Sequence, residues 1–437
     1  MTFQWVRPSL KQRKILEWWM EGSPFAALAY ILLEGSVRSA KTSTGSFSFV
    51  LWAMKSFHNE EFAFCGKTIG ACRRNLVRPL KKMLASEPGF VVQDKLSVVE
   101  GPHLVISYCG HTNIFWIFGG KDESSQDLIQ GVTLAGIFFD EVLLMPLSFV
   151  WQGLNRLSRT GSKAWFTDNP ATPTHAIYQE ILDPYQAAGK LYFLRLTLDD
   201  NPALPEDAKA RLKSQYPEGS VLYRRNILGL RTAAEGRVFS FFDELPEAGF
   251  VVEQVPQNFT LYLCGLDYGI ANPFAAQLWG LSGGVWYCLK EFYWDSKEER
   301  KQKSNAEYIE DLARLCYWNG DRKTPAKILV PPEEPGFQRE IRQSTHQHLY
   351  NVRDADNKIM PGIEDLTTLL SLGKFKLFKD CKKTIWGLND LLWDEKKQQQ
   401  GIDMFQKGGS GSPDHACDCS RYIAREAAKQ LRQMRLL

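Results

Sequence analysis

The chain has 437 residues, of which 44% are hydrophobic and 24% are charged, values close to those of ordinary globular proteins. This composition excludes a disordered chain and a coiled coil, and at roughly 150 residues per domain the length favours two or three domains. The 53 basic and 50 acidic side chains leave a formal net charge of +3, which is too small for the whole surface to attract nucleic acid. Any contact with nucleic acid is therefore expected to come from local clusters of basic residues.

The N-terminal sequence MTFQWVRPSLKQRK lacks the apolar core of a signal peptide, and no run of about 18 uncharged apolar residues follows it. The nine cysteines show no paired CxxC spacing, which argues against a zinc site or a disulfide framework. We therefore expect a cytosolic protein without a membrane segment, whose thiols are reduced and lie mainly in the core.

Two α/β patterns follow one another along the chain. The first, over residues 1–230, places apolar runs between polar and helical stretches, which is typical of buried parallel strands: AYILLEG, FAFCGK, NIFWIFGG, AGIFFDE and KAWFTDNP. Glycines and prolines punctuate residues 231–258, which predicts a linker. The second pattern, over residues 259–437, begins at LYLCGLDYG and ends in a helix carrying HACDCSRYIAREAAKQL. The tract QKGGSGSPDH before that helix predicts a mobile loop.

The segment LLEGSVRSAKTSTG predicts a strand, a glycine turn and a helix in the register of a phosphate-binding P-loop, or Walker A motif. Loop N–H groups would surround phosphate oxygens, Lys41 would contact the β- and γ-phosphates, and the Thr42 hydroxyl would bind Mg²⁺. Ala40 replaces the usual second glycine, so we expect a negative φ there and a variant loop. A chance glycine turn before an amphipathic helix is the alternative. The predicted ATP-binding residues of the loop are Gly35, Ser36, Val37, Arg38, Ser39, Ala40, Lys41 and Thr42.

Ninety-nine residues after Lys41, GIFFDEV predicts an apolar strand that ends in Asp140 and Glu141, the pattern of a Walker B motif. Asp140 would hold Mg²⁺ through water, and Glu141 would orient or deprotonate the attacking water. An exposed acidic turn is the alternative.

Three arginines are candidates for neutralising phosphate charge. Arg38 in the P-loop could act within its own subunit, and Arg156 and Arg159 could serve an adjoining subunit as arginine fingers. A solvated arginine is the alternative for each of them.

Acidic residues gather at three places in the second α/β pattern. Asp267 ends an apolar run, Glu333 and Glu334 follow the strand AKILV, and Asp414 and Asp418 flank His415 near the start of the last helix. Phosphodiester cleavage by two divalent ions needs such convergent carboxylates, so the pattern predicts a metal-dependent nuclease. The alternatives are a helix N-cap for Asp414 and solvated loop positions for the others.

These motifs, in this order, resemble the large terminase subunit of tailed bacteriophages over nearly the whole chain. TDNPATPTHAIY resembles the family's coupling motif, and LTLDDNPALPED with YRRNILGLRTAAEGRVF resembles the stretch that closes its ATPase domain. LDYGIANPFAAQLWG and DHACDCSRYIAREA resemble its first and last nuclease motifs. The resemblance implies an N-terminal P-loop ATPase domain of the ASCE type and a C-terminal RNase H-like nuclease domain. Such a protein drives double-stranded DNA into a procapsid with ATP and cuts concatemeric DNA.

By matching position, the resemblance assigns further roles. Gln12 would lie on the adenine side of ATP, and Thr167 and Asn169 would be the coupling residues. Two Mg²⁺ or Mn²⁺ ions at the nuclease site would be held by Asp267 and Asp418, with Asp414 and His415 nearby. In the middle nuclease motif, Pro331 stands where the family usually has a carboxylate, so Glu334, or Glu333, would be the metal ligand from that motif. Asp168, within the coupling motif, is a milder deviation from the family pattern.

The resemblance also implies partners and a location. The partners would be double-stranded DNA, the small terminase subunit and the portal of the procapsid, on which the chain would form a pentamer. It would work in the host cytoplasm and be absent from the mature virion. The alternative functions are a helicase or repair-type translocase without nuclease activity, and a packaging subunit with a decayed nuclease. Basic stretches that could follow DNA phosphates, or simply be solvated, are Arg73, Arg74, Arg78, Lys81 and Lys82, and the tail residues Arg421, Arg425, Arg432 and Arg435.

Overall fold

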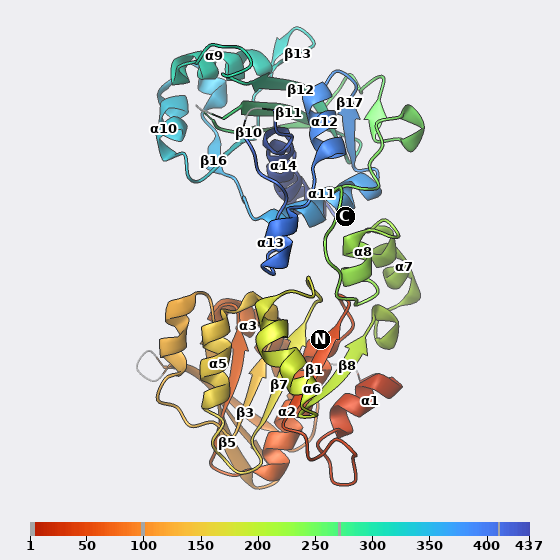
Figure 1. The fold of residues 1–437 in the computed structure, drawn as a ribbon, viewed down its shortest axis with the longest axis vertical. Coiled ribbons are helices and arrows are strands. Elements are labelled where there is room, and N and C mark those ends of the chain that lie inside the picture. Colours follow the sequence, from red (N-terminus) through yellow and green to blue (C-terminus); the bar gives the residue numbers. More distant parts are fainter. Residues whose placement is uncertain (1–4, 98–100, 270–271, 410) are drawn as a thin grey trace. The chain divides into compact units, whose positions relative to one another are not determined.

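A computed structural model describes residues 5–97, 101–269, 272–409 and 411–437. The chain forms two compact units (Figure 1): unit 1 comprises Met1–Leu212 and Val221–Ala233, and unit 2 comprises Lys213–Ser220 and Ala234–Leu437. The last passage from unit 1 to unit 2, between Ala233 and Ala234, falls inside the segment predicted as a linker, and the chain also enters unit 2 earlier, over Lys213–Ser220. None of the helices in the described ranges is long and apolar enough to cross a bilayer.

Unit 1 is built on an eight-stranded sheet in the order β3-β4-β5-β2-β6-β7-β1-β8. The six strands from β5 to β8 in this order are parallel, and β3 and β4 extend the sheet with antiparallel pairs. The five apolar runs singled out in the sequence form β1, β2, β5, β6 and β7, so the predicted parallel strands are confirmed. The strands are β1 (Tyr30–Gly35), β2 (Glu61–Gly66), β3 (Val91–Ser97), β4 (Gly101–Tyr108), β5 (His111–Gly119), β6 (Gly136–Phe139), β7 (Lys163–Asp168) and β8 (Leu191–Leu196).

The central strands of unit 1 are apolar at consecutive positions because both faces of the sheet are covered. Leu33 and Phe138 belong to the core cluster that also contains residues of α2, whereas their chain neighbours Leu32 and Phe139 pack on the opposite face with residues of α5. The helices are α1 (Leu10–Glu17), α2 (Lys41–Ser56), α3 (Ile69–Cys72), α4 (Arg78–Leu84), α5 (Leu147–Asn155), α6 (Asp183–Ala187), α7 (Glu206–Ser214) and α8 (Val221–Asn226), with 3₁₀ or π-helical segments η1 (Arg73–Val77), η2 (Glu123–Ile129), η3 (Val142–Leu144), η4 (Tyr178–Leu182) and η5 (Leu198–Asp200).

Unit 2 contains a seven-stranded mixed sheet in the order β16-β15-β10-β11-β12-β17-β9. Its antiparallel centre is β10–β12, and parallel strands flank it on both sides. The strands of unit 2 are β9 (Val251–Val252), β10 (Leu261–Asp267), β11 (Phe274–Ser282), β12 (Val285–Trp294), β13 (Tyr317–Trp318), β14 (Asp321–Arg322), β15 (Lys327–Val330), β16 (Val352–Asp354) and β17 (Phe375–Phe378).

The long helix α14 (Asp414–Gln433) lies against β10, where Gly265 allows a close approach. A Cβ at Gly265 would lie 2.9 Å from Ile423 Cγ1 and 3.0 Å from the Cys419 carbonyl oxygen. The first turns of α14 are therefore held beside the end of β10. The other helices of unit 2 are α9 (Asn305–Leu315), α10 (Pro335–Gln343), α11 (Ile359–Ser371), α12 (Lys382–Asp390) and α13 (Glu395–Gln399), with turns η6 (Pro246–Ala248) and η7 (Gln347–Leu349).

Candidate nucleotide and metal sites

The predicted P-loop connects the carboxyl end of β1 to the start of α2, the place where parallel sheets present ligand sites. Gly35 must be a glycine, because a Cβ there would lie 1.9 Å from the carbonyl oxygen of Leu196 on β8. The N–H of Ser36 donates to the same oxygen at 2.9 Å, and Ser39 Oγ donates to the Ser36 carbonyl at 2.9 Å. The loop is thus closed on itself and fastened to β8.

The backbone at Ala40 contradicts the expectation from the sequence. A negative φ was expected, but Ala40 has φ +65° and ψ +18°, and Arg38 also has a positive φ of +58°. The loop therefore uses left-handed residues at two positions, and for an L-residue each costs about 1 kcal/mol. The contacts that fasten the loop to β8 stabilise this conformation. Arg38 exposes its side chain to solvent, and its carbonyl accepts a hydrogen bond from Asn201 Nδ2 at 2.8 Å.

Lys41 turns its ammonium group into the loop. Nζ donates to the carbonyl oxygens of Gly35 at 3.3 Å and Ser36 at 3.0 Å, and to Asn169 Oδ1 at 2.6 Å. Burial lowers the pKa of Lys41 to about 8, although the charges of Asp168, Asp140 and Glu141 act in the opposite direction. A buried ammonium group held only by neutral oxygens favours an anionic partner.

The two predicted Walker motifs meet at Asp140, which follows β6. Its Oδ1 accepts hydrogen bonds from Thr42 Oγ1 and Thr167 Oγ1, both at 2.8 Å. Thr167 Oγ1 also accepts from the Glu141 N–H at 3.1 Å. Burial, and then the charge of Asp140, raise the pKa of Glu141, which stands at a positive φ of +56°. The structure thus brings the four predicted residues together.

Two other residues predicted for this region, Gln12 and Arg159, have local partners. Gln12 is buried and completes a capping box with Ser9 at the start of α1. Arg159 pairs with Glu60 at 2.8 Å at the surface, and the Nε of Arg156 is buried without a hydrogen-bond partner.

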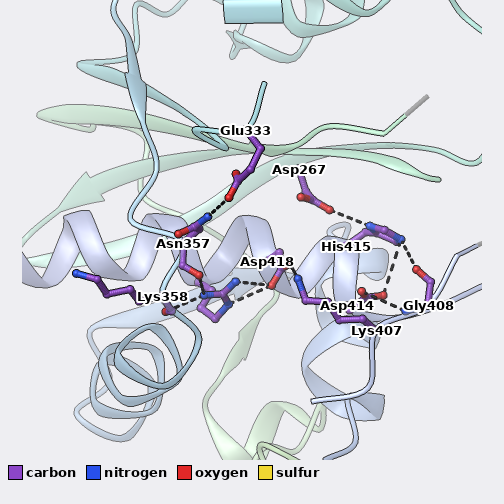
Figure 2. A network of polar contacts seen from close by, with 10 residues as sticks. Asp267, Glu333, Asn357, Lys358, Lys407, Gly408, Asp414, His415 and Asp418 are labelled. Carbon is purple, nitrogen blue, oxygen red and sulfur yellow. Dashed lines mark hydrogen bonds and ion pairs between the residues drawn. The ribbon is translucent and has the colours of Figure 1, made fainter. Parts of the chain in front are cut away.

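In unit 2, Asp267 at the end of β10 faces His415 on α14 (Figure 2). Asp267 Oδ2 lies 2.8 Å from His415 Nδ1, and His415 Nε2 lies 3.1 Å from the Gly408 carbonyl oxygen. Burial raises the pKa of Asp267 to about 6; Asp418 adds to this, while His415 and Lys407 oppose it. Burial lowers the pKa of His415, but Asp267 and the other carboxylates outweigh it and raise the pKa overall. The two side chains therefore form an ion pair in the window above the pKa of Asp267 and below the raised pKa of His415, where the carboxyl is ionised and the imidazole holds its proton.

Asp418 lies one helical turn after His415 and is held by two cations. Arg421 donates through Nε at 3.0 Å and through a terminal nitrogen at 2.8 Å to Oδ1, and Lys407 Nζ lies 3.5 Å from Oδ2. Asp414 is not the N-cap of α14, a position that Pro413 occupies; its carboxylate accepts from the Gly408 N–H at 3.4 Å. Lys407 and Gly408 belong to the loop predicted to be mobile, and through them this loop contacts Asp418, Asp414 and His415. Residue 410 of the loop and residues 270 and 271 of the first nuclease motif lie outside the described residues.

The two glutamates after β15 differ in their surroundings. Glu333 Oε1 accepts from Asn357 Nδ2 at 2.5 Å, and Asn357 also offers its carbonyl to Arg421. Glu334 is the N-cap residue of α10, and burial followed by the charge of Glu333 raises its pKa. Within the described ranges, no three acidic, histidine or cysteine side chains are gathered closely enough to hold a metal ion. Asp267 and Asp418 are thus brought together without a completed ligand set.

The expectation that Arg421 lines a DNA path is wrong, because Arg421 is 1% exposed and its guanidinium binds Asp418 and the carbonyls of Asn357 and Lys358. A run of arginines on a helix does not reveal which one faces inward until the partner of that helix is known. Arg425 and Arg432 are both paired with Asp365, and Arg435 is exposed.

The basic stretch of η1 and α4 is divided in two. Arg73 and Lys81 both bind Asp94, at 2.8 and 2.7 Å. The other three, Arg74, Arg78 and Lys82, are exposed, and all five cations line a groove of about 440 Å³.

Comparison with known proteins identifies the family. The family model for the N-terminal part of T4-like large terminase subunits matches residues 32–245. The large terminase of Salmonella phage P22 is 23% identical over 269 residues, which make up 58% of this chain and about half (49%) of that protein. A solved structure of the large terminase from a thermophilic bacteriophage is 41% identical, with a TM-score of 0.86, and the match covers 96% of this chain and 99% of that one. The same thermophilic phage protein in complex with ADP matches with 40% identity and a TM-score of 0.83 over 95% of this chain and 98% of that one. The chain therefore belongs to the large terminase subunits of bacteriophages and has their α/β fold, with an ATPase and a nuclease domain.

Proposed function

We propose that this chain is the motor of DNA packaging: unit 1 hydrolyses ATP and drives double-stranded DNA into the procapsid. The observation that carries the proposal is the hydrogen-bonded cluster of Thr42, Asp140 and Thr167 beside Glu141. Support also comes from the similar terminase of the thermophilic bacteriophage, whose structures include complexes with ADP and ATP-γ-S.

The hydrogen bonds suggest how the site works. On binding ATP, Lys41 would exchange the loop carbonyls for phosphate oxygens, and the loop N–H groups would receive the rest of the phosphate charge. Thr42 and Asp140 would hold Mg²⁺, which neutralises phosphate charge. Glu141 would orient the attacking water and accept its proton, a role that its raised pKa favours. The proposal also includes Gln12 on the adenine side of ATP and Arg38 in the loop. Arg156 or Arg159 would act as an arginine finger in the site of a neighbouring subunit.

Transmission to the DNA would start at the end of β7. Thr167 binds Asp140 and Asn169 binds Lys41, so both Walker motifs are linked to one strand end. A change at the γ-phosphate would move this strand end. The exposed stripe of Arg74, Arg78 and Lys82 is our candidate for contacts to DNA phosphates.

We further propose that unit 2 cuts DNA with Mg²⁺ or Mn²⁺. Asp267 and Asp418 fit this role because the two carboxylates are close enough for the charge of Asp418 to raise the pKa of Asp267, so a cation between them would be favourable. A bound divalent ion would supply an activated water and neutralise phosphate charge. Glu334, or Glu333, would complete the ligand set of the two ions by a local movement, and His415 would orient Asp267.

The remaining assignments rest on the family and, for the domain boundary, on the glycines and prolines of residues 231–258. We propose that the domain boundary lies in residues 231–258, that the chain acts in the host cytoplasm, and that it forms a pentamer on the portal together with the small terminase subunit.

A packaging assay with matched variants tests the motor. Glu141→Gln should bind nucleotide normally, lower phosphate release by at least 100-fold and leave no DNA protected from nuclease digestion inside procapsids. Glu180→Gln changes an exposed carboxylate on η4 and should behave like the wild type. Undiminished turnover in Glu141→Gln would contradict the assignment.

A further inference from the structure

Two carboxyl groups lie side by side immediately behind the P-loop, and neither has a role in the mechanism above. Glu34 is the residue before Gly35 on β1, and Asp168 is its register partner on the parallel strand β7. Both residues are fully buried. Two buried carboxyl groups in adjacent positions destabilise a fold unless a proton or a cation neutralises them.

The cation is Arg231. Its Nε donates to Glu34 Oε2 at 2.5 Å, a terminal nitrogen donates to Asp183 Oδ1 at 2.6 Å, and its guanidinium carbon lies 3.6 Å from the centre of the Tyr178 ring. Arg195 on β8 is also near Glu34, but at 3.9 Å and with 42% of its side chain exposed, against 17% for Arg231. Arg231 is therefore the better placed of the two to compensate Glu34.

Asp168 is the member of the pair that favours a proton. Burial and the neighbouring charge of Glu34 raise the pKa of Asp168 well above its usual value, and Arg231, Lys41 and Tyr178 oppose this shift without cancelling it. Arg231 is therefore the cation that pairs with Glu34 in this buried couple.

The segment that carries Arg231 also packs against the loop itself. The carbonyl oxygen of Asn226 accepts from the Val37 N–H at 3.0 Å. Gly229 has φ +65°, and a Cβ there would lie 3.0 Å from Gly35 Cα and 3.1 Å from the Ser36 nitrogen. Residues 226–231 thus form the support of the P-loop on the side of β8.

We propose that Arg231 is a positioning residue for ATP, which acts through Glu34 to hold the entrance of the P-loop against residues 226–231. The inference rests on the proposed role of this loop as the ATP site. Arg231 does not touch the loop N–H groups; it fixes the strand end from which they start. Without the guanidinium, Glu34 is a buried carboxylate with no hydrogen-bonding cation, so it moves toward solvent and displaces Gly35 with it.

A double-mutant cycle separates this role from simple packing. Binding of a fluorescent ADP analogue is measured for the wild type, Arg231→Gln, Glu34→Gln and the double variant Glu34→Gln/Arg231→Gln. Arg231→Gln should weaken binding at least tenfold, and the double variant should return to within about threefold of the wild type, because it has no uncompensated carboxylate. Arg195→Gln is the matched control and should change binding less than twofold.

Several results would overturn the proposal. Wild-type affinity in Arg231→Gln, or a double variant that binds as weakly as Arg231→Gln, would show that Arg231 does not act through Glu34. If Arg231→Gln does not fold, the folded double variant is compared directly with the wild type, and weak binding by it contradicts the proposal. Failure of the wild type and of Arg195→Gln to bind ADP is a different result, which would refute the ATP site itself.

Discussion

Asn169 accepts a hydrogen bond from Lys41 at 2.6 Å although 128 positions separate the two residues. Thr167, two residues before Asn169, donates a hydrogen bond to Asp140 at 2.8 Å. The end of β7 therefore touches the predicted phosphate-binding lysine and the predicted magnesium-binding aspartate at once. A change at either side chain reaches the same strand end, which is the physical basis for a coupling role.

Thr167→Ala should slow ATP hydrolysis by about 10- to 100-fold, because Asp140 and the Glu141 N–H each lose a hydrogen-bond partner. Nucleotide affinity should change less than about threefold, since Thr167 is not expected to contact the phosphates. Steady-state phosphate release and equilibrium nucleotide binding measure the two effects. Thr167→Ser keeps the hydroxyl and should retain most of the activity; equal losses in both variants would show that the methyl group matters instead.

Gly229→Ala should weaken nucleotide binding, because the new methyl group would press on Gly35 and Ser36. Gly189→Ala is the matched control: its φ is +64°, against +65° at Gly229, but no atom lies within 4 Å of its Cβ position. Both variants should lose about 1 kcal/mol of stability from the left-handed backbone. Only Gly229→Ala should also lose ADP affinity, and an equal loss in the control would refute the support of the loop by residues 226–231.

The pKa of Asp168 predicts a pH dependence of stability. A carboxyl group whose pKa is raised on folding holds its proton in the native state while the unfolded state loses it above about pH 4, so its contribution to stability decreases as pH rises toward the native pKa. The slope is at most about 1.4 kcal/mol per pH unit for one group. Asp168→Asn removes this titrating group. The free energy of unfolding, measured with denaturant between pH 5 and 8, should then depend less on pH than it does in the wild type. An unchanged profile would mean that Asp168 is ionised in the native protein.

Arg421→Gln should destabilise unit 2 by about 3–5 kcal/mol, because Asp418 would remain buried without its partner. Arg432→Gln, from an ion pair in which the arginine is 53% exposed, should cost less than about 1 kcal/mol. Hydrogen exchange of the α14 amides measures the loss of stability in both variants. Reduced DNA affinity in Arg421→Gln without any loss of protection would instead support the contact to DNA that its burial argues against.

Local patterns in the sequence predicted much of the fold and of the nucleotide site. Each strand of the parallel sheet that the sequence predicted is built around consecutive apolar residues, and the residues at the ends of β1, β6 and β7 meet because parallel strands present their carboxyl ends at one edge. The positions of Lys41 and Asp140 followed from these two regularities, and the role of Thr167 followed from the family resemblance.

The features that escaped prediction depend on long-range packing. The left-handed backbone of Ala40 is stabilised by contacts of the loop with β8, not by its own residue type. The pairing of Glu34 with Arg231 joins positions 197 residues apart. Arg421 lies in the same run as Arg425, Arg432 and Arg435, and its side chain is the buried one because α14 packs against β10 and α11.

The most direct test of a motor joined to a separate nuclease follows two reactions of one protein in parallel. Plasmid DNA is incubated with the wild type or with Asp267→Ala in Mg²⁺, Mn²⁺ or EDTA, while phosphate release from ATP is measured in the two metal buffers. We expect metal-dependent cutting by the wild type, at least a 100-fold reduction of cutting in Asp267→Ala, and phosphate release within twofold in both proteins. Normal phosphate release without cutting by the wild type in either metal would contradict the nuclease and leave unit 2 as a decayed or DNA-binding domain.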